Sequence, residues 1–426
     1  MASSTTLPAD QAGGAAAASG DLVSEMESAF KSSVELGQIP GAVVMAKDVT
    51  GKINHVRCYG ARSVRPDEHG NLPPMEADTI MRMGQATTLI GTVMALQCVD
   101  RGLVGLDDDV ERFLPDLTSM KVLAGFDAEG KPIMRERNGV ITLRGLLTDT
   151  SGLSHVPINP LLQQYCAKGY STYPLPIGSE TDVPDPLLAP PVGDPGKEWI
   201  HGTNLDWAGR LVERATGMDL ESYMQQYVCA PLGISDMTFK LQQRPDLMAR
   251  RADLTKRNRE DGTLHYDDTV YFRKDPAECY GGSGLFASPA AFMAVMHSLL
   301  RRDGVLLKPE TVDQMFEPAL DETLARGMNE HFNKVMRFIN YGYPLPQWPD
   351  LRRNYGFGAI VLAQDLDGDK WRRKGSMSIN CGWNVGLQID PAAGLCTIVA
   401  FQTSPYSTPI EEALVHKYEK AMYSLL

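Results

Sequence analysis

The segments that read as β-strands lie near the two ends of this chain and are separated by a long helix-rich middle. Residues 41–63 predict two strands joined by a short turn, and residues 353–404 predict several more. Apolar residues at helical spacing predict one helix over residues 21–37 and a closing helix over residues 409–426. The chain therefore has to close one mostly antiparallel sheet from both of its ends, with helices packed against it.

The length of the chain predicts a large domain with an insertion. With 426 residues, it exceeds what a single compact core usually holds. We expect an α/β subdomain from residues 21–85 and 280–426, and an inserted helix-rich subdomain with long pocket loops from residues 86–279. Residues 1–20 are small, polar and rich in Gly and Ala, which is typical of a disordered tail.

Composition and charge narrow the classes of partner. The formal net charge of -12 argues against nucleic acid and anionic membrane surfaces, and no apolar run is long enough to cross a bilayer. The first residues lack the pattern of a secretory signal, so we expect a cytoplasmic protein. Seven dispersed cysteines and eight dispersed histidines suggest neither a disulfide framework nor a metal site. We expect a small-molecule substrate and no cofactor; the oligomeric state stays open.

Several segments, in the same order along the chain, resemble one known superfamily. They are residues 81–117, 141–156, 195–237, 280–300, 354–364 and 375–402. Together they resemble the serine β-lactamases and penicillin-binding proteins, and most of all the esterase branch and the fungal acyltransferases of the lovastatin-transesterase type. The resemblance implies a serine β-lactamase-like fold, with an antiparallel sheet flanked by helices and an inserted helical subdomain.

The catalytic positions of that superfamily carry other residues in this chain. The Ser-x-x-Lys pattern falls on residues 85–88, where Gln85 and Thr88 replace the nucleophile and its lysine. The position of the superfamily's catalytic Tyr falls on His201, and its Trp-Gly-Gly motif falls on residues 379–381. Asp149 stands where members of the esterase branch commonly carry a His.

These replacements predict acid–base chemistry. A carboxamide is not a nucleophile, and losing the nucleophile of a catalytic set removes ~10⁶ of rate. The new residues are still polar, and an imidazole suits proton transfer near neutral pH. We therefore predict a non-hydrolytic enzyme of fungal-type specialised metabolism that cyclises, isomerises or dehydrates a small, largely apolar intermediate. His201 would be the acid–base group, while Gln85 and Thr88 complete the catalytic set.

A second set of residues is predicted to bind the substrate. It comprises Asn380, Asp149, Tyr173, Tyr280, Cys381 and Trp383. Tyr173, in a Pro-rich loop, is the candidate lid residue, and Asp149 could instead pair with a cation or cap a turn. Two other functions stay open: an acyltransferase or esterase whose nucleophile has moved to Cys381, and a ligand-binding protein without catalysis.

Overall fold

One seven-stranded antiparallel sheet forms the centre of the molecule. The structure is a computed structural model that describes residues 9–171, 187, 189–267, 279–332, 353–365, 372–405 and 408–426. In spatial order, the sheet consists of β10 (Arg353–Tyr355), β11 (Ile360–Leu362), β12 (Met377–Cys381), β13 (Val385–Asp390), β14 (Leu395–Ala400), β1 (Gly41–Asp48) and β2 (Asn54–Gly60). The predicted sheet from both chain ends is confirmed.

The junction of the two chain ends lies between β1 and β14. Val43 of β1 pairs with Ala400 on one side and with Cys58 of β2 on the other. Side chains of successive strand residues point to opposite faces. Ala42 and Val44 accordingly belong to the core on one face, while Val43 belongs to the core on the other. Because the strand is buried on both sides, its sequence is almost continuously apolar.

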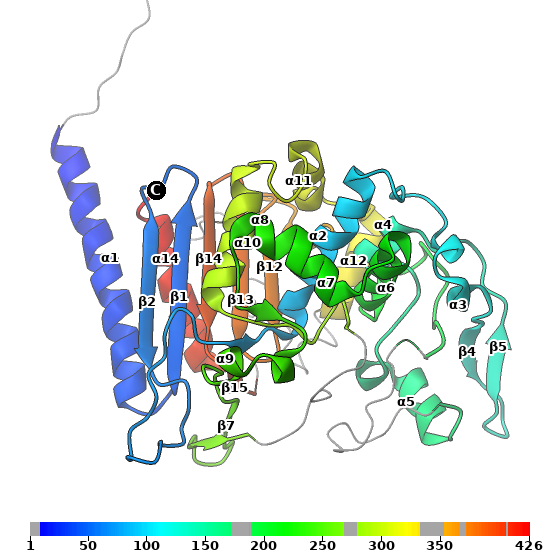
Figure 1. Ribbon diagram of the computed structural model, residues 1–426, viewed down its shortest axis with the longest axis horizontal. Helices are drawn as coiled ribbons and strands as arrows, with labels where there is room; N and C mark the ends of the chain where they lie inside the picture. The colour runs from blue at the N-terminus through cyan, green and yellow to red at the C-terminus, as the bar shows by residue number, and fades with distance from the viewer. Residues whose placement is uncertain are drawn as a thin grey trace, which may run out of the picture.

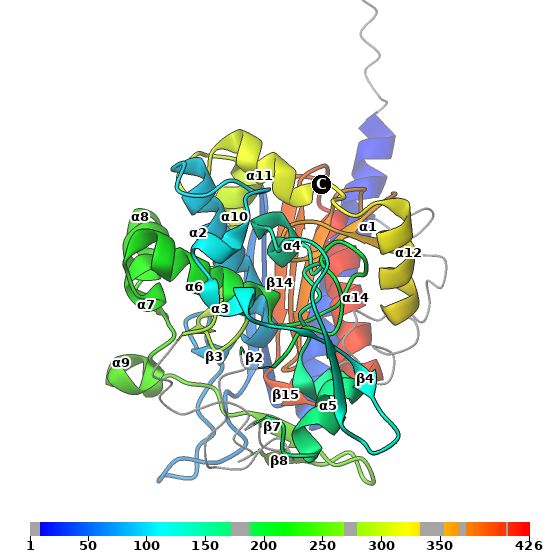
Figure 2. The ribbon, with the colours of Figure 1, turned by 90° about the vertical axis from the view of Figure 1, so that its right-hand side faces the viewer.

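Helices from the two chain ends cover one face of the sheet. These helices are α1 (Ala9–Glu35) and α14 (Pro409–Tyr423), and Figure 2 shows them packed together on that face. Phe30 of α1 lies between Tyr59 and Tyr418, with ring centroids 4.9 Å and 6.5 Å away. The first helix begins at Ala9, so residues 9–20 are helical where we had expected a disordered tail.

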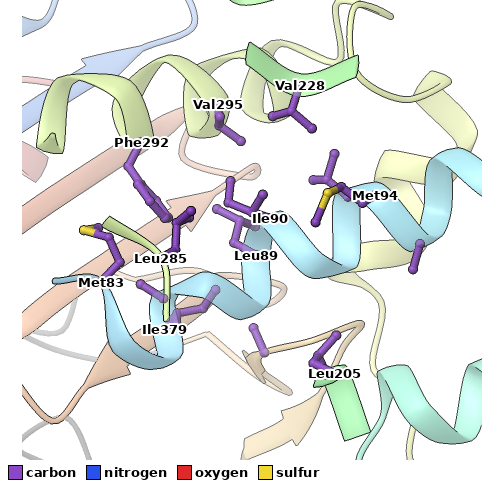
Figure 3. Packing of buried hydrophobic residues seen from close by; sticks show 14 of the residues in the cluster. Met83, Leu89, Ile90, Met94, Leu205, Val228, Leu285, Phe292, Val295 and Ile379 are labelled. Carbon is purple, nitrogen blue, oxygen red and sulfur yellow. The ribbon is translucent and has the colours of Figure 1, made fainter. Parts of the chain in front are cut away.

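The opposite face is covered by α10 (Pro289–Arg301) and α2 (Thr87–Asp100), as Figure 1 and Figure 2 show. Helix α2 is apolar on every side, and its residues 87–98 are all buried. Figure 3 shows Ile90 of α2 close to Phe292 and Val295 of α10 in this core. The helix that begins two residues after residue 85, the superfamily's nucleophile position, therefore lies at the centre of the main core.

A loop at Gly281 packs against both α2 and α6 (Asn204–Thr216), which also contact each other. A Cβ atom on Gly91 of α2 would overlap the carbonyl oxygen of Gly281, and one on Gly281 would overlap the carbonyl oxygen of Leu205 in α6. Gly209 lies against the same loop, where a Cβ would meet the Gly281 nitrogen at 3.0 Å. The two helices can approach the loop only because these positions have no side chain.

The remaining elements complete the helical layer and its rim (Figure 1). The helices are α3 (Pro115–Thr118), α4 (Leu143–Leu147), α5 (Pro160–Ala167), α7 (Leu220–Met224), α8 (Ala230–Leu232), α9 (Pro245–Met248), α11 (Pro309–Phe316) and α12 (Glu322–His331). The short strands are β3 (Met81–Arg82), β4 (Val122–Phe126), β5 (Pro132–Arg135), β6 (Met237–Thr238), β7 (Thr255–Arg257), β8 (Leu264–Tyr266), β9 (Phe286–Ala287) and β15 (Thr403–Ser404). Among the helices described, none has the length and apolar character that a membrane span requires.

Candidate active site

Residue 85 lies in a tight turn that is pressed against the end of β12. The turn is a short 3₁₀ helix, Gly84–Ala86, which leads directly into α2. Gly84 has a φ of +50°, and a Cβ there would lie 3.2 Å from the Cβ of Cys381 and 3.1 Å from Nε1 of Trp383. Glycine thus allows the close approach, which brings the Gln85 carboxamide to the strand end. Its Oε1 accepts a hydrogen bond of 3.4 Å from the Gly382 N–H.

Thr88 presents a hydroxyl that makes no hydrogen bond to any part of the chain that the structure describes. The residue is 9% exposed, and its Oγ1 has no described donor or acceptor within reach. The neighbouring Thr87, by contrast, donates to the Gly84 carbonyl at 2.5 Å, as a threonine in a first helical turn often does. A buried hydroxyl without a partner costs free energy, so Thr88 is available to a bound molecule.

His201 is paired with Asp149. Its Nδ1 lies 3.0 Å from Oδ2 of Asp149, which is 1% exposed. The other carboxylate oxygen, Oδ1, accepts from Nδ2 of Asn204 at 2.7 Å, and the hydroxyl of Tyr355 also bonds to this carboxylate. Asp149 adopts the left-handed region with a φ of +56°, which is uncommon outside glycine and is frequent at functional sites.

The partner of Asp149 is therefore an imidazole and not a Lys or Arg side chain. A carboxylate on Nδ1 holds the proton on that nitrogen and leaves the Nε2 lone pair free to accept a proton. The backbone supports the same pairing, because the Ile200 N–H donates to the Asp149 carbonyl at 2.7 Å. Asp149 and the loop before α6 are thus joined at both side chain and main chain.

Aromatic rings surround His201. Trp199 stacks on it at 6.1 Å with an interplanar angle of 13°, and His155 meets it edge-on at 5.3 Å. Burial lowers the pKa of His155 to about 3, and the charge of His201 adds to this shift. Burial likewise lowers the pKa of His331, which contacts Trp199. Both neighbouring imidazoles are therefore neutral at physiological pH, and His201 has the carboxylate partner.

One tight loop connects the Asp149 group with α2. It begins at Tyr355, which bonds to Asp149, and reaches Gly358 three residues later. The Gly358 N–H donates to the Leu147 carbonyl at 2.7 Å. On its other side, a Cβ on Gly358 would lie 3.5 Å from the Thr88 carbonyl oxygen. The loop therefore contacts α2 at Thr88 and Thr92 on one side and Leu147, two residues before Asp149, on the other.

Asn380 does not join this group. It lies on β12 between Ile379 and Cys381, whose side chains pack into the α2 core, and Figure 3 shows Ile379 beside the start of α2. Alternation then puts Asn380 on the opposite face, with Ser378, whose hydroxyl accepts a bond from Arg372 at 3.1 Å. The predicted role of Asn380 in binding the substrate is not supported by its position.

The other predicted binding residues have different surroundings. Cys381 is completely buried, and burial raises the pKa of its thiol to about 11. Trp383 lies against Gly84 beneath residue 85, and Tyr280 is half-buried next to the Gly281 loop. Tyr173, the predicted lid residue, lies outside the described residues.

Sequence reasoning missed Asn204, His331 and Arg353. Asn204 holds the carboxylate of Asp149 in place, and its only signal was its position three residues after His201. His331 and Arg353 belong to the wall beyond Trp199, and no motif marked them. Within the described ranges, no group of three or more His, Cys, Asp or Glu side chains is arranged to hold a metal ion.

Comparison with known proteins shows which family and which proteins this chain is similar to. The family model described as Beta-lactamase matches residues 26–418. The chain is 55% identical to the ML-236A carboxylate methylbutanoyltransferase of Penicillium citrinum, over 96% of each protein. It is also 55% identical to the monacolin J acid methylbutanoyltransferase of Aspergillus terreus, over 96% of this chain and 97% of that protein.

A solved structure agrees with this likeness. The unliganded simvastatin synthase of Aspergillus terreus matches with a TM-score of 0.87 and 53% identity, over 95% of this chain and 98% of that one. The predicted serine β-lactamase-like fold is confirmed. The predicted cyclisation, isomerisation or dehydration is wrong, because relatives that match almost the whole chain are acyltransferases.

Proposed function

We propose, from the premise that the chain belongs to the β-lactamase family, that it is an acyltransferase. It would move an acyl group from an activated donor, for which we take a thioester, to a hydroxyl of a small, largely apolar acceptor. The likeness to two methylbutanoyltransferases over almost the whole chain supports the reaction class. The observation that carries the chemistry is the buried Asp149–His201 pair, which can take the proton of an attacking hydroxyl.

The residue at the family's nucleophile position excludes the usual covalent route through residue 85. Gln85 has a carboxamide, which does not attack an acyl carbon, and Thr88 is no base for a neighbouring hydroxyl. Cys381 is a poor substitute, because its thiol is fully buried and protonated at physiological pH. We therefore infer that the acyl group passes directly from donor to acceptor while both are bound.

In the direct transfer, His201 acts as the base, and every proton and bond is accounted for. Nε2 takes the proton of the acceptor hydroxyl as its oxygen forms a bond to the carbonyl carbon of the donor. The carbon–sulfur bond then breaks, and the leaving thiolate receives that proton from the imidazolium. The products are an ester and a free thiol, and Asp149 stabilises the transient imidazolium.

The turn at residue 85 would bind the carbonyl oxygen of the donor's acyl group. The Gly382 N–H points to Oε1 of Gln85, so an acyl oxygen that displaces this amide oxygen would accept the same hydrogen bond. Such a donor stabilises the charge that develops on the oxygen during attack. Gln85 would then act by positioning the donor, and its NH₂ group can add a second hydrogen bond.

A ligand-binding protein without catalysis is the second candidate. The observation that favours it is the replacement of the Ser and Lys by Gln85 and Thr88. Its signature would be a ligand that raises thermal stability without being converted. The cytoplasmic location and the origin in fungal specialised metabolism stay predictions.

The test uses the methylbutanoyl group and the monacolin J acid of the relatives' names, with the acyl group supplied as a thioester of our choice. The protein is incubated with a methylbutanoyl thioester and monacolin J acid, and the ester product is quantified by liquid chromatography with mass spectrometry. We expect ester formation, with a loss of ~10²-fold or more in His201→Ala. His69→Ala, which changes an exposed histidine, is the matched control. Thermal stabilisation by the acceptor without any ester, across donors of different acyl length, would favour the second candidate and refute the first.

A further inference from the structure

Among the residues that the structure describes, Arg353 is a buried guanidinium without a counter-ion. Its residue is 8% exposed, and no described residue makes a hydrogen bond to its Nε. Burial is the cause that lowers its pKa to about 10, with no carboxylate opposing the shift. Its backbone is fixed by Asn329, whose Nδ2 donates to the Arg353 carbonyl at 2.8 Å. A buried charge without a partner is costly, so its retention requires an explanation.

Arg353 lies close to residues that contact the candidate active site. Arg353 and Tyr355 lie two residues apart on β10, so their side chains share one face of the strand. Tyr355 reaches Asp149 from this face. The guanidinium carbon lies 5.5 Å from the ring centre of Phe332, and that ring is 5.3 Å from Trp199, which stacks on His201.

Two more buried polar atoms of the same wall have no hydrogen-bond partner within the described ranges. They are Nε1 of Trp199 and Nε2 of His331, whose rings lie 5.5 Å apart. The indole nitrogen is a donor only, and so is the guanidinium. The wall beside His201 therefore contains unused donors and, among the described residues, no anion that pairs with Arg353. Such a set suits a ligand rich in acceptor oxygens.

We propose that Arg353 anchors a carboxylate of the acceptor molecule, so that the acceptor's hydroxyl is presented to His201. The inference rests on the proposed acyl transfer for the identity of the bound molecule. A planar guanidinium matches the two oxygens of a carboxylate and gives orientation as well as affinity. Two of the similar proteins are named for substrates that are a carboxylic acid or carboxylate. The anionic group of a phosphopantetheine thioester donor has related chemistry, so the test separates the two sources.

The experiment measures binding and needs no turnover. Titration calorimetry compares monacolin J acid with its methyl ester on the unaltered protein, Arg353→Met, Arg353→Lys and the control Arg301→Met, which changes an exposed arginine. We expect the acid to bind ~10- to 100-fold tighter than the ester, the range for a hydrogen-bonded ion pair. Arg353→Met should abolish this preference and leave ester binding unchanged. Arg353→Lys should keep a reduced preference, and Arg301→Met should keep all of it.

Thermal unfolding of the ligand-free variants gives an independent readout. Arg353→Met should melt at the same or a higher temperature than the unaltered protein, because it removes an unpaired buried charge. A lower melting temperature together with an unchanged preference for the acid would show that Arg353 is structural. Equal binding of acid and ester to the unaltered protein would also overturn the proposal.

A donor comparison completes the design. If Arg353→Met weakens binding of a phosphopantetheine thioester and spares that of the acid, the anion is the donor's phosphate, and the proposal fails. If no ester forms with any donor while the acid preference depends on Arg353, the proposed acyl transfer fails and the carboxylate site stands. The two claims can therefore be refuted separately.

Discussion

The substitution Asp149→Asn tests the catalytic pair with the least change in shape. The amide oxygen of an asparagine at residue 149 has to accept the hydrogen bond from Nδ2 of Asn204, which is 2.7 Å away in the structure. Its NH₂ group then faces Nδ1 of His201. An N–H donor at this point favours the tautomer with the proton on Nε2, so the base loses its free lone pair.

The expected loss follows from that change of tautomer. General acid–base catalysis contributes ~10²- to 10⁴-fold, which corresponds to about 3–5 kcal/mol of transition-state stabilisation. Stability should change far less, because the asparagine keeps a hydrogen bond to Asn204 and fills the same volume. We expect a loss of about 1–2 kcal/mol in the free energy of unfolding, which is the size of one altered buried hydrogen bond.

The assay is the initial rate of ester formation at saturating donor and acceptor, with thermal unfolding followed by circular dichroism. Asp246→Asn, at a carboxylate that is 59% exposed, is the control and should keep the full rate. If Asp149→Asn folds and retains more than about a third of the rate, His201 does not act through Asp149. The proposed mechanism would then be wrong.

Three further predictions concern the nucleophile, the core and pH. Cys381→Ala should keep the rate of ester formation within about 2-fold, because a buried thiol with a pKa of about 11 supplies no nucleophile; a loss above ~10²-fold would restore the idea of a relocated nucleophile. Gly91→Ala should lower the free energy of unfolding by at least about 2 kcal/mol in urea titration, because its Cβ overlaps Gly281, and unchanged stability would contradict this packing. Asp219→Ala should cost about 1 kcal/mol at pH 7, because Asp219 caps α7. Hydrogen bonding from Ser222 lowers the pKa of Asp219 in the folded protein. The stability difference between the two proteins should therefore be complete above about pH 4 and should vanish as the pH falls through the folded-state pKa of Asp219. A stability difference that grows in acid would contradict this prediction.

The fold was predictable because its signal is repeated along the chain. Short apolar runs bounded by turn residues marked the strands at both ends, and helical spacing marked α14 and most of α1. The N-terminal end of α1 was missed, since Ala and Gly without periodicity resemble a tail. The position of Asn380 could have been found from sequence, because Met377, Ile379 and Cys381 form an apolar alternation that puts Asn380 on the other face.

The site was less predictable because its contacts join distant segments. His201 was selected by its position in the resemblance, but its distance to Asp149, 52 residues earlier, follows only from the packing of the loop against residue 149. The unpaired state of Arg353 depends on burial and on the absence of a neighbour, which no motif encodes. The reaction class was misjudged because it was inferred from single side chains, whereas a relative that matches almost the whole chain is a methylbutanoyltransferase.

The most direct test of direct acyl transfer is the intact mass of the protein quenched during turnover with a methylbutanoyl thioester and a hydroxyl acceptor. We predict ester formation while the protein keeps its unmodified mass at every time point. The double variant Gln85→Ser/Thr88→Lys, which restores both the hydroxyl and the lysine of the family's pattern, serves as the control for adduct detection. An acyl adduct on the unaltered protein that forms and decays at the rate of ester formation would contradict the account.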